Sequence, residues 1–195
     1  MNRSNNINKI AAVIPFYNES KTINEVIEKT LKQVDYIFAI DDGSTDNSIQ
    51  KFTSKENVLL IRNSFNRGKG YALRTGMRSA IDEGFEKIVT LDADLQHNPD
   101  EIPLLLSGLK DYHIVIGNRL SNLCRMPLQR RMSNKITSKL LSIKTGQEAE
   151  SEILIKSARL GYKIGFVNIS TIYGEEKSKM NGLKTTIDFI RLLFL

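Results

Sequence analysis

The sequence is poor in cysteine and histidine and has no tryptophan. Its 195 residues include one cysteine, Cys124, and two histidines, His97 and His113. A single cysteine excludes an internal disulfide and a cysteine-based zinc site, and so few histidines exclude a histidine metal cluster. No apolar run approaches the roughly 20 residues that cross a bilayer, and the first residues lack the apolar stretch of a secretory signal. The sequence therefore predicts a protein of the reducing cytoplasm.

Composition and charge indicate a globular domain with one cationic region. Apolar residues make up 41% and charged residues 26% of the chain, which is typical of a protein with a real core. Acidic residues are absent between Asp111 and Glu148, where Arg119, Arg125, Arg130, Arg131, Lys135, Lys139 and Lys144 lie. This basic stretch accounts for the whole net charge of +6, so the rest of the chain is nearly neutral. It predicts an anionic partner: phosphate, a membrane surface or nucleic acid. Nucleic acid is the weakest of the three, because only Tyr112, at the edge of the stretch, could stack on a base.

Hydrophobic periodicity predicts alternating strands and helices. Apolar runs indicate strands at 10–16, 36–40, 58–62, 88–91, 113–117 and 164–169, and helical spacing indicates helices at 22–34, 47–54, 69–83, 101–109, 132–143 and 152–160. Thr22 and Glu25 have the spacing of a capping box. The helix at 69–83 has an apolar stripe of Ala72, Leu73, Gly76, Met77, Ala80 and Ile81. Three of these residues are small enough to let a sheet approach closely. The alternation indicates an α/β fold with a parallel sheet covered by helices on both faces.

Polar side chains follow four successive predicted strands. Ligands of open parallel sheets bind beyond the carboxyl ends of the strands, so these side chains are expected at one rim. They are Tyr17, Asn18 and Glu19 after the first strand, Asp41, Asp42 and Asp46 after the second, Asn63, Asn66, Gly68, Lys69 and Gly70 after the third, and Asp92, Asp94, Gln96 and His97 after the fourth.

The pair Asp92 and Asp94 is the sharpest of these motifs. Two carboxylates just past a buried strand can hold a hard divalent cation, with a ligand's phosphates completing its shell, and Gln96 could add a carbonyl oxygen. Taken alone, such a pair is more often a turn cap before a proline, here Pro99. The three other polar strand ends shift the interpretation to a metal site.

Two further motifs have a structural and a functional interpretation, and both stay open. Asp42 could accept hydrogen bonds from a nucleoside, but Asx turns and a helix cap also explain the residues around it. The glycines at 66–70 suit a phosphate loop at a helix start, or simply a tight turn, and the spacing is not that of a Walker loop. His97 has no metal-ligating companion and is expected to make a turn hydrogen bond.

The motifs VIPFYNES, IDDGSTDNS, NRGKGYALRTG, LDADLQHNPDEI and IGNRL, in this order, resemble the family 2 glycosyltransferases. Within that family the resemblance is to the dolichol-phosphate mannosyltransferase-like, or polyprenyl-phosphate, branch. It covers about 9–146 and resumes at 152–179. It implies a GT-A type (Rossmann-like) fold, a catalytic domain at 9–179, a nucleotide-sugar donor (GDP- or UDP-linked) and inverting transfer to a dolichyl or undecaprenyl phosphate.

The resemblance also implies roles for individual residues. Pro15, Tyr17, Glu19, Asp42 and Asp92 would bind the nucleotide, and Asp92, Asp94 and Gln96 would hold Mg²⁺ or Mn²⁺ against the diphosphate. Asp94 and Arg119 would be catalytic, Arg119, Arg130, Arg131 and Ser133 would meet the acceptor phosphate, and Lys177, Ser178 and Lys179 would close over the diphosphate. The acceptor phosphate is already ionised at neutral pH, so this transfer needs no general base.

The C-terminal segment and the cellular location follow from the same expectation. The segment 180–195 is expected to be an amphipathic helix lying in the membrane interface, with a core-packing helix or a shortened membrane segment as the alternatives. The protein would then be cytoplasmic and peripherally associated with the cytoplasmic face of the membrane.

One departure from the family pattern affects the acceptor side. Between Gln147 and Glu152 the resemblance implies a few dozen further residues, which are either deleted here or omitted from the sequence. Two other functions therefore stay open. One is transfer to a sugar hydroxyl in polysaccharide synthesis, with Glu150 or Glu152 as general base, and the other is a nucleotide-sugar-binding module with an incomplete acceptor site.

Overall fold

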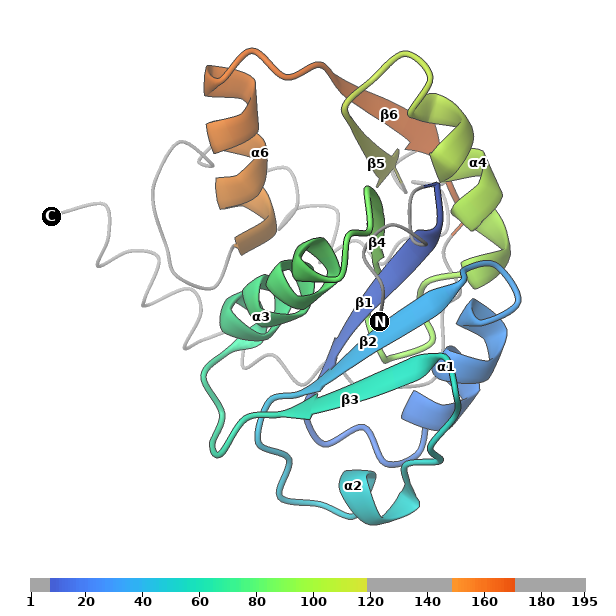
Figure 1. Cartoon of the computed structure of the whole chain (residues 1–195), viewed down its shortest axis with the longest axis vertical. Coiled ribbons are helices and arrows are strands. Elements are labelled where there is room, and N and C mark those ends of the chain that lie inside the picture. Colours follow the sequence, from blue (N-terminus) through green and yellow to red (C-terminus); the bar gives the residue numbers. More distant parts are fainter. Residues whose placement is uncertain (1–7, 119–148, 171–195) are drawn as a thin grey trace, which may run out of the picture.

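The computed structural model describes residues 8–118 and 149–170 (Figure 1). Several predicted features lie outside these ranges: Arg119, Arg130, Arg131, Ser133, Lys177, Ser178, Lys179, and the helices predicted at 132–143 and 180–195. Their roles stay predictions.

Strands and helices alternate along the described chain as predicted. In order they are β1 (Ile10–Phe16), α1 (Ile23–Thr30), β2 (Tyr36–Asp41), α2 (Ser48–Lys51), β3 (Val58–Arg62), α3 (Lys69–Asp82), β4 (Lys87–Thr90), the 3-10 helix η2 (Pro99–Glu101), α4 (Ile102–Gly108), β5 (Ile114–Asn118), α6 (Ala149–Arg159) and β6 (Ile164–Asn168). Each predicted strand is confirmed to within one residue at either end. The first two helices are shorter than predicted.

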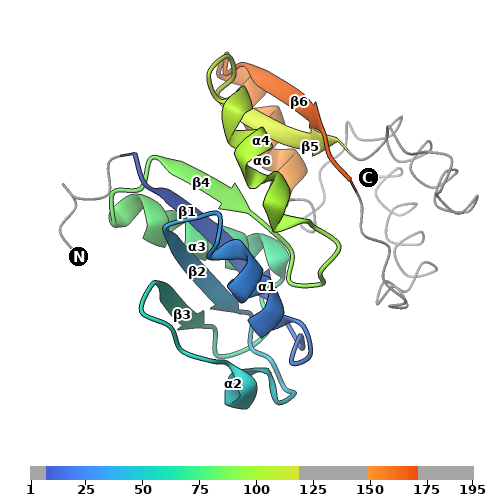
Figure 2. The same cartoon turned by 90° about the vertical axis from the view of Figure 1, so that its right-hand side faces the viewer.

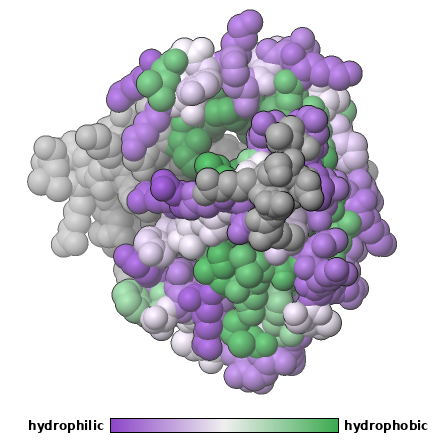
Figure 3. Space-filling view, in the orientation of Figure 1, coloured by the Kyte–Doolittle hydropathy of each residue, from purple (hydrophilic) through white to green (hydrophobic). Residues whose placement is uncertain are grey.

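All strand pairs are parallel, but they form two sheets. The larger sheet has the order β3-β2-β1-β4, and the smaller pairs β5 with β6. Within the described residues, the outer edges of β4 and β5 pair with no other strand. Figure 3 shows the surface hollowed where α6, β4 and β5 border one another, with apolar residues around the hollow. The alternating pattern alone had suggested a single sheet.

Helices cover both faces of the larger sheet, as predicted (Figure 2). Side chains alternate across a strand, and in β1 this places Ala12, Ile14 and Phe16 on the face packed by α1. On the opposite face, Ala11 and Val13 pack with residues of α3. Every residue of β2, and every residue of β1 after Ile10, is buried. A strand buried on both faces is expected to be continuously apolar, which explains why these two strands are so clear in the sequence.

Gly76 lets α3 lie close to the sheet. A Cβ at this position would clash with Val13 and lie 3.0 Å from Ile40 Cγ1. The predicted stripe of α3 is confirmed at Ala72, Leu73, Gly76 and Ala80, all buried, with Met77 packed beside them. It is wrong at Ile81, which is 59% exposed.

The predicted capping box at the start of α1 is also wrong. Thr22 has αR backbone angles (φ −115°, ψ −29°) and its side chain caps no helix N–H. An N-cap residue needs an extended backbone to aim its oxygen at the first turn. The Thr22 hydroxyl instead donates to Glu19 Oε2 at 3.2 Å, because the backbone already turns at Glu19, whose carbonyl accepts from the amides of Thr22 and Ile23.

The smaller sheet is covered by α4 on one face. A Cβ on Gly108 of α4 would lie 3.0 Å from Val115 Cγ2 of β5, so helix and sheet are in close contact there. Phe166 of β6, which pairs with Ile116 of β5, is 69% exposed. Among the helices that the structure describes, none has the length and apolar character needed to span a bilayer.

Candidate functional site: the carboxyl-end rim of the larger sheet

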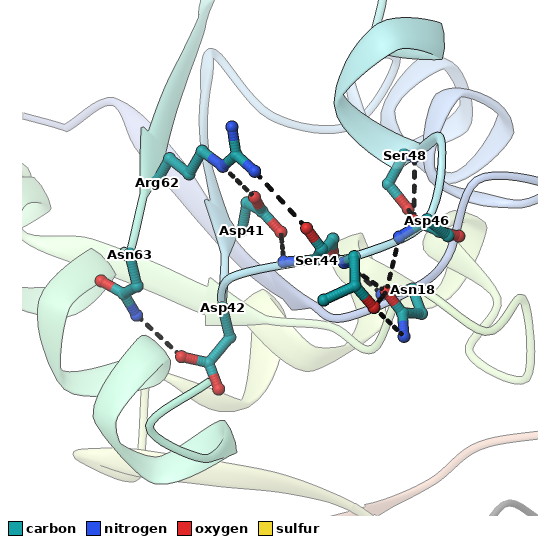
Figure 4. Close-up of polar contacts among 9 residues, drawn as sticks. Asn18, Asp41, Asp42, Ser44, Asp46, Ser48, Arg62 and Asn63 are labelled. Carbon is teal, nitrogen blue, oxygen red and sulfur yellow. Dashed lines mark hydrogen bonds and ion pairs between the residues drawn. The ribbon is translucent and has the colours of Figure 1, made fainter. Parts of the chain in front are cut away.

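The loops after β1 and β2 are tied together by hydrogen bonds to one asparagine. Asn18, at φ +57°, accepts at its side-chain oxygen from the backbone amides of Thr45 (2.8 Å) and Asp46 (3.2 Å). Its own backbone amide donates to Ser44 Oγ at 2.9 Å. Figure 4 shows this group of side chains beside the carboxyl end of β2. The first two strand ends therefore form one rigid unit.

Two acidic residues stabilise that unit, Asp41 at the end of β2 and Asp46 beyond it. Asp41 is fully buried, accepts from the Ser44 amide at 2.8 Å and pairs with Arg62 Nε at 3.1 Å (Figure 4). Burial opposes ionisation of Asp46, but hydrogen bonds from Ser48 and Ser20 outweigh burial and hold the pKa of Asp46 below its ordinary value. The Asx-turn interpretation is thus confirmed for Asp46, whose Oδ1 accepts from the Ser48 amide at 2.9 Å. The helix-cap interpretation is wrong for Asp46, because the N-cap of α2 is Asn47 and its side chain makes no capping hydrogen bond.

Asp42 anchors the loop that follows β3. Its carboxylate is 3% exposed and accepts from Asn63 Nδ2 at 2.8 Å, from the Arg67 amide at 3.0 Å and from the Gly68 amide at 2.7 Å. A carboxylate that accepts several N–H groups is held firmly in one orientation. Asp42 thereby fixes the start of α3 against the end of β2.

Gly43 is required for that close approach. It has φ +73°, and a Cβ on it would lie 2.5 Å from the carbonyl carbon of Phe65. Only glycine combines a left-handed backbone with such contact between two main chains. Arg67, held by Asp42, lies over the Tyr71 ring with its guanidinium carbon 3.6 Å from the ring centroid.

The same loop reaches the end of β4 through Lys69. Lys69 Nζ lies 2.7 Å from Asp92 Oδ1, with both side chains partly exposed. The Asp92 amide donates to His97 Nδ1 at 3.1 Å, so the predicted turn hydrogen bond of His97 is confirmed. Residues 67–69 therefore join two carboxylates, Asp42 from β2 and Asp92 from beyond β4.

Asp94 lies in a tight turn beside Asp92. Its Oδ1 accepts from the Gln96 amide at 3.0 Å, and Leu95 between them has φ +60°. The interpretation of Asp94 as a turn cap is therefore confirmed. It is compatible with a metal role, because a carboxylate has further acceptor positions.

The residues at the end of β4 fit a hard divalent ion of the kind that phosphates help to hold. In the described ranges no three histidine, cysteine or acidic side chains converge as a complete metal cage. Mg²⁺ and Mn²⁺ are commonly held by one or two carboxylates with the remaining positions taken by substrate phosphates and water. Asp92 and Asp94, two residues apart on one rim, supply that donor set.

The other predicted site residues lie along the same rim. Pro15 is buried in β1, and Tyr17, directly after that strand, is 39% exposed. Glu19 is bonded to Thr22 in the turn before α1. Sequence reasoning missed the anchoring role of Asp42 and the pairing of Lys69 with Asp92. Their only signal was the placement of all these residues after strands that follow one another in the sequence.

Comparison with known structures defines the class of protein. Glucosyl-3-phosphoglycerate synthase from Mycobacterium tuberculosis, solved with Mn²⁺ and UDP-glucose, superposes with a TM-score of 0.62 at 21% sequence identity, covering 98% of this chain and 80% of that one. By its fold this protein is therefore a GT-A-type α/β protein.

Comparison of sequences identifies the family. The model of glycosyl transferase family 2 matches residues 11–166. The chain is 31% identical to UDP-N-acetylglucosamine–dolichyl-phosphate N-acetylglucosaminyltransferase of Methanococcus voltae, across 95% of each protein. It is 35% identical to undecaprenyl-phosphate 4-deoxy-4-formamido-L-arabinose transferase of Proteus mirabilis, across 60% of this chain and 38% of that protein. The chain belongs to glycosyl transferase family 2 and is a glycosyltransferase.

The M. voltae alignment is longer than this chain. The alignment runs over 243 residues, whereas this whole chain has 195. Dozens of its positions therefore have no counterpart here.

Proposed function

We propose that this chain transfers a sugar from a nucleotide-sugar donor, GDP- or UDP-linked, to a polyprenyl phosphate, either dolichyl or undecaprenyl phosphate. The observation that carries the proposal is the similarity to the M. voltae enzyme, which extends over 95% of both proteins. The P. mirabilis relative is also named for a polyprenyl-phosphate acceptor. The rim at the carboxyl ends of β1–β4 supports the donor half, because nucleotides bind to open parallel sheets at that edge.

Each part of the rim has a proposed task. Asp92, Asp94 and Gln96 hold Mg²⁺ or Mn²⁺, which supplies positive charge to the leaving diphosphate. Pro15, Tyr17, Glu19 and Asp42 border the nucleoside, and Asp42 acts chiefly by fixing the loop at 66–68.

The residues outside the described ranges have proposed tasks on the acceptor side. Arg119, with Arg130, Arg131 and Ser133, meets the acceptor phosphate, and Lys177, Ser178 and Lys179 close over the diphosphate. The acceptor attacks through an ionised phosphate oxygen with inversion at the sugar carbon, so no general base is needed. We further propose that the protein works at the cytoplasmic membrane face as a peripheral protein, with the basic stretch directed to anionic lipid head groups.

A direct assay tests this function. The protein is incubated with UDP- or GDP-sugars, Mn²⁺ and a polyprenyl phosphate, and lipid-linked sugar is measured. We expect product from the native sequence, and for Asp94→Ala a loss of about a hundredfold or more, the scale on which electrostatic contacts at a reacting centre contribute. Asp100→Ala removes a carboxylate from η2 and should retain activity. Undiminished transfer by Asp94→Ala would remove Asp94 from the mechanism.

The alignment favours a second candidate function, donor binding without transfer. The positions missing relative to the M. voltae enzyme support an incomplete acceptor side. In that case a nucleotide sugar with Mn²⁺ should raise the melting temperature, while no lipid-linked sugar forms. Product formation would exclude this candidate.

A further inference from the structure

Lys69 forms an ion pair with Asp92, one of the two carboxylates proposed to bind the metal. Lys69 Nζ lies 2.7 Å from Asp92 Oδ1, within contact distance for a charge-assisted hydrogen bond. The other oxygen of Asp92 lies 3.9 Å from His97 Nε2. The Asp92 carboxylate is therefore in direct contact with the Lys69 ammonium group.

The backbone before Lys69 is held by Asp42, whereas the side chain of Lys69 is partly exposed. The amides of Arg67 and Gly68 are held by Asp42 at 3.0 and 2.7 Å, and Lys69 is the first residue of α3. Its side chain is 42% exposed. A lysine carries its charge on a flexible four-carbon stem, so the ammonium group can move while the loop stays in place.

From this geometry we infer that Lys69 is an exchangeable counter-ion of the metal site. It neutralises Asp92 while the site is metal-free and leaves Asp92 when a divalent cation binds there. The released ammonium group then lies on the same rim as the donor and pairs with the donor diphosphate. This inference rests on the proposed function for the identity of the donor, but its first half concerns only Lys69, Asp92 and a divalent ion.

The inference predicts opposite effects of one substitution on two ligands. Lys69→Met keeps the stem and removes the charge, so Mn²⁺ no longer competes with an ammonium group for Asp92. In the absence of nucleotide, Mn²⁺ should bind about three- to tenfold more tightly, the range expected for a partly exposed charge pair. In saturating Mn²⁺, UDP or GDP should bind about three- to tenfold more weakly, because the diphosphate loses its partner.

Two variants serve as matched controls. Lys69→Arg keeps the positive charge and should stay within about twofold of the native protein for Mn²⁺. Lys55→Met breaks another ion pair, Lys55 Nζ with Glu28 Oε1 at 3.2 Å, and changes the net charge equally. Lys55 lies before β3, at the amino end of that strand, so Lys55→Met should leave both affinities unchanged.

Mn²⁺ affinity is measured from the electron paramagnetic resonance signal of free Mn²⁺, and nucleotide affinity by calorimetry. Unchanged or weaker Mn²⁺ binding by Lys69→Met would overturn the inference, as would the absence of Mn²⁺ binding by the native protein. If Lys69→Met lowers the affinities for both Mn²⁺ and the nucleotide, Lys69 only supports the loop. The transfer assay distinguishes this inference from the proposed function. If the native protein forms lipid-linked product but Lys69→Met gains no Mn²⁺ affinity, the proposed function stands and only this inference fails.

Discussion

The anchoring role of Asp42 leads to a prediction about stability. Its buried carboxylate receives N–H groups from Asn63, Arg67 and Gly68. Asp42→Asn has nearly the same shape, but one oxygen becomes an NH₂ group that faces N–H donors. At least one buried or partly buried donor then loses its acceptor, and the bonds that remain are no longer charge-assisted.

The cost follows from the number of bonds lost. Leaving a buried donor unsatisfied costs about 1–3 kcal/mol, and a hydrogen bond to a charged group contributes about 1.5–3 kcal/mol. We therefore expect Asp42→Asn to lower the free energy of unfolding by about 2–4 kcal/mol. For a chain of this size, that corresponds to a fall in melting temperature of roughly 5–15 °C.

Urea denaturation followed by circular dichroism at pH 7 measures this loss. Asp100→Asn is the matched control, because Asp100 also accepts a side-chain hydrogen bond, from Gln33 Nε2 at 3.0 Å, but is exposed. It should change stability by less than about 0.5 kcal/mol. If Asp42→Asn is as stable as Asp100→Asn, the anchoring argument fails. Normal stability with lost nucleotide binding would instead favour direct contact between Asp42 and the nucleoside.

Three further predictions concern packing and pH. Gly76→Ala should destabilise the protein by about 1–3 kcal/mol in urea denaturation, because the added Cβ would clash with Val13. Alanine normally stabilises a helix relative to glycine, so a gain in stability would refute the close contact. The pKa of Asp46 is lowered, so its stabilising effect is complete above the ordinary carboxyl range near pH 4 and is lost as pH falls through the lower folded-state value. Asp46→Asn should therefore show a smaller fall in unfolding free energy between pH 5 and pH 3 than the native protein. An equal fall in both proteins would contradict this prediction. Burial, and secondarily the charge of Glu83, raise the pKa of Tyr36, so stability should fall as pH rises above about 10; Tyr36→Phe should lack this fall, and an identical alkaline profile would count against it.

The strands were predictable because their environment is uniform. β1 and β2 are buried on both faces, so their apolar runs directly reflect the structure. The start of α1 was not predictable, because a capping-box spacing does not determine whether Thr22 has the extended backbone that a cap requires. Ile81 fits the helical spacing but is 59% exposed, because helical spacing does not determine how far along the helix the sheet contact extends.

The candidate site shows the same division. Its residues were found from the sequence, because polar side chains after successive parallel strands must gather at one edge. Their contacts could not be found from the sequence, because the partners are far apart in the chain and no local pattern links them. Asp42 and its partners at 67–68 are separated by 25 or 26 residues, and Lys69 and Asp92 by 23.

The amino-acid sequence by itself determined the order of strands and helices, the family motifs and the edge at which polar groups collect, because these depend on local periodicity and on residue type. Only the tertiary structure decided that the strands form two sheets, that Asp42 is used to hold a loop, and that Lys69 rests on Asp92. These outcomes depend on distances between segments far apart in the chain, which are set when the two faces of the sheet pack against their helices.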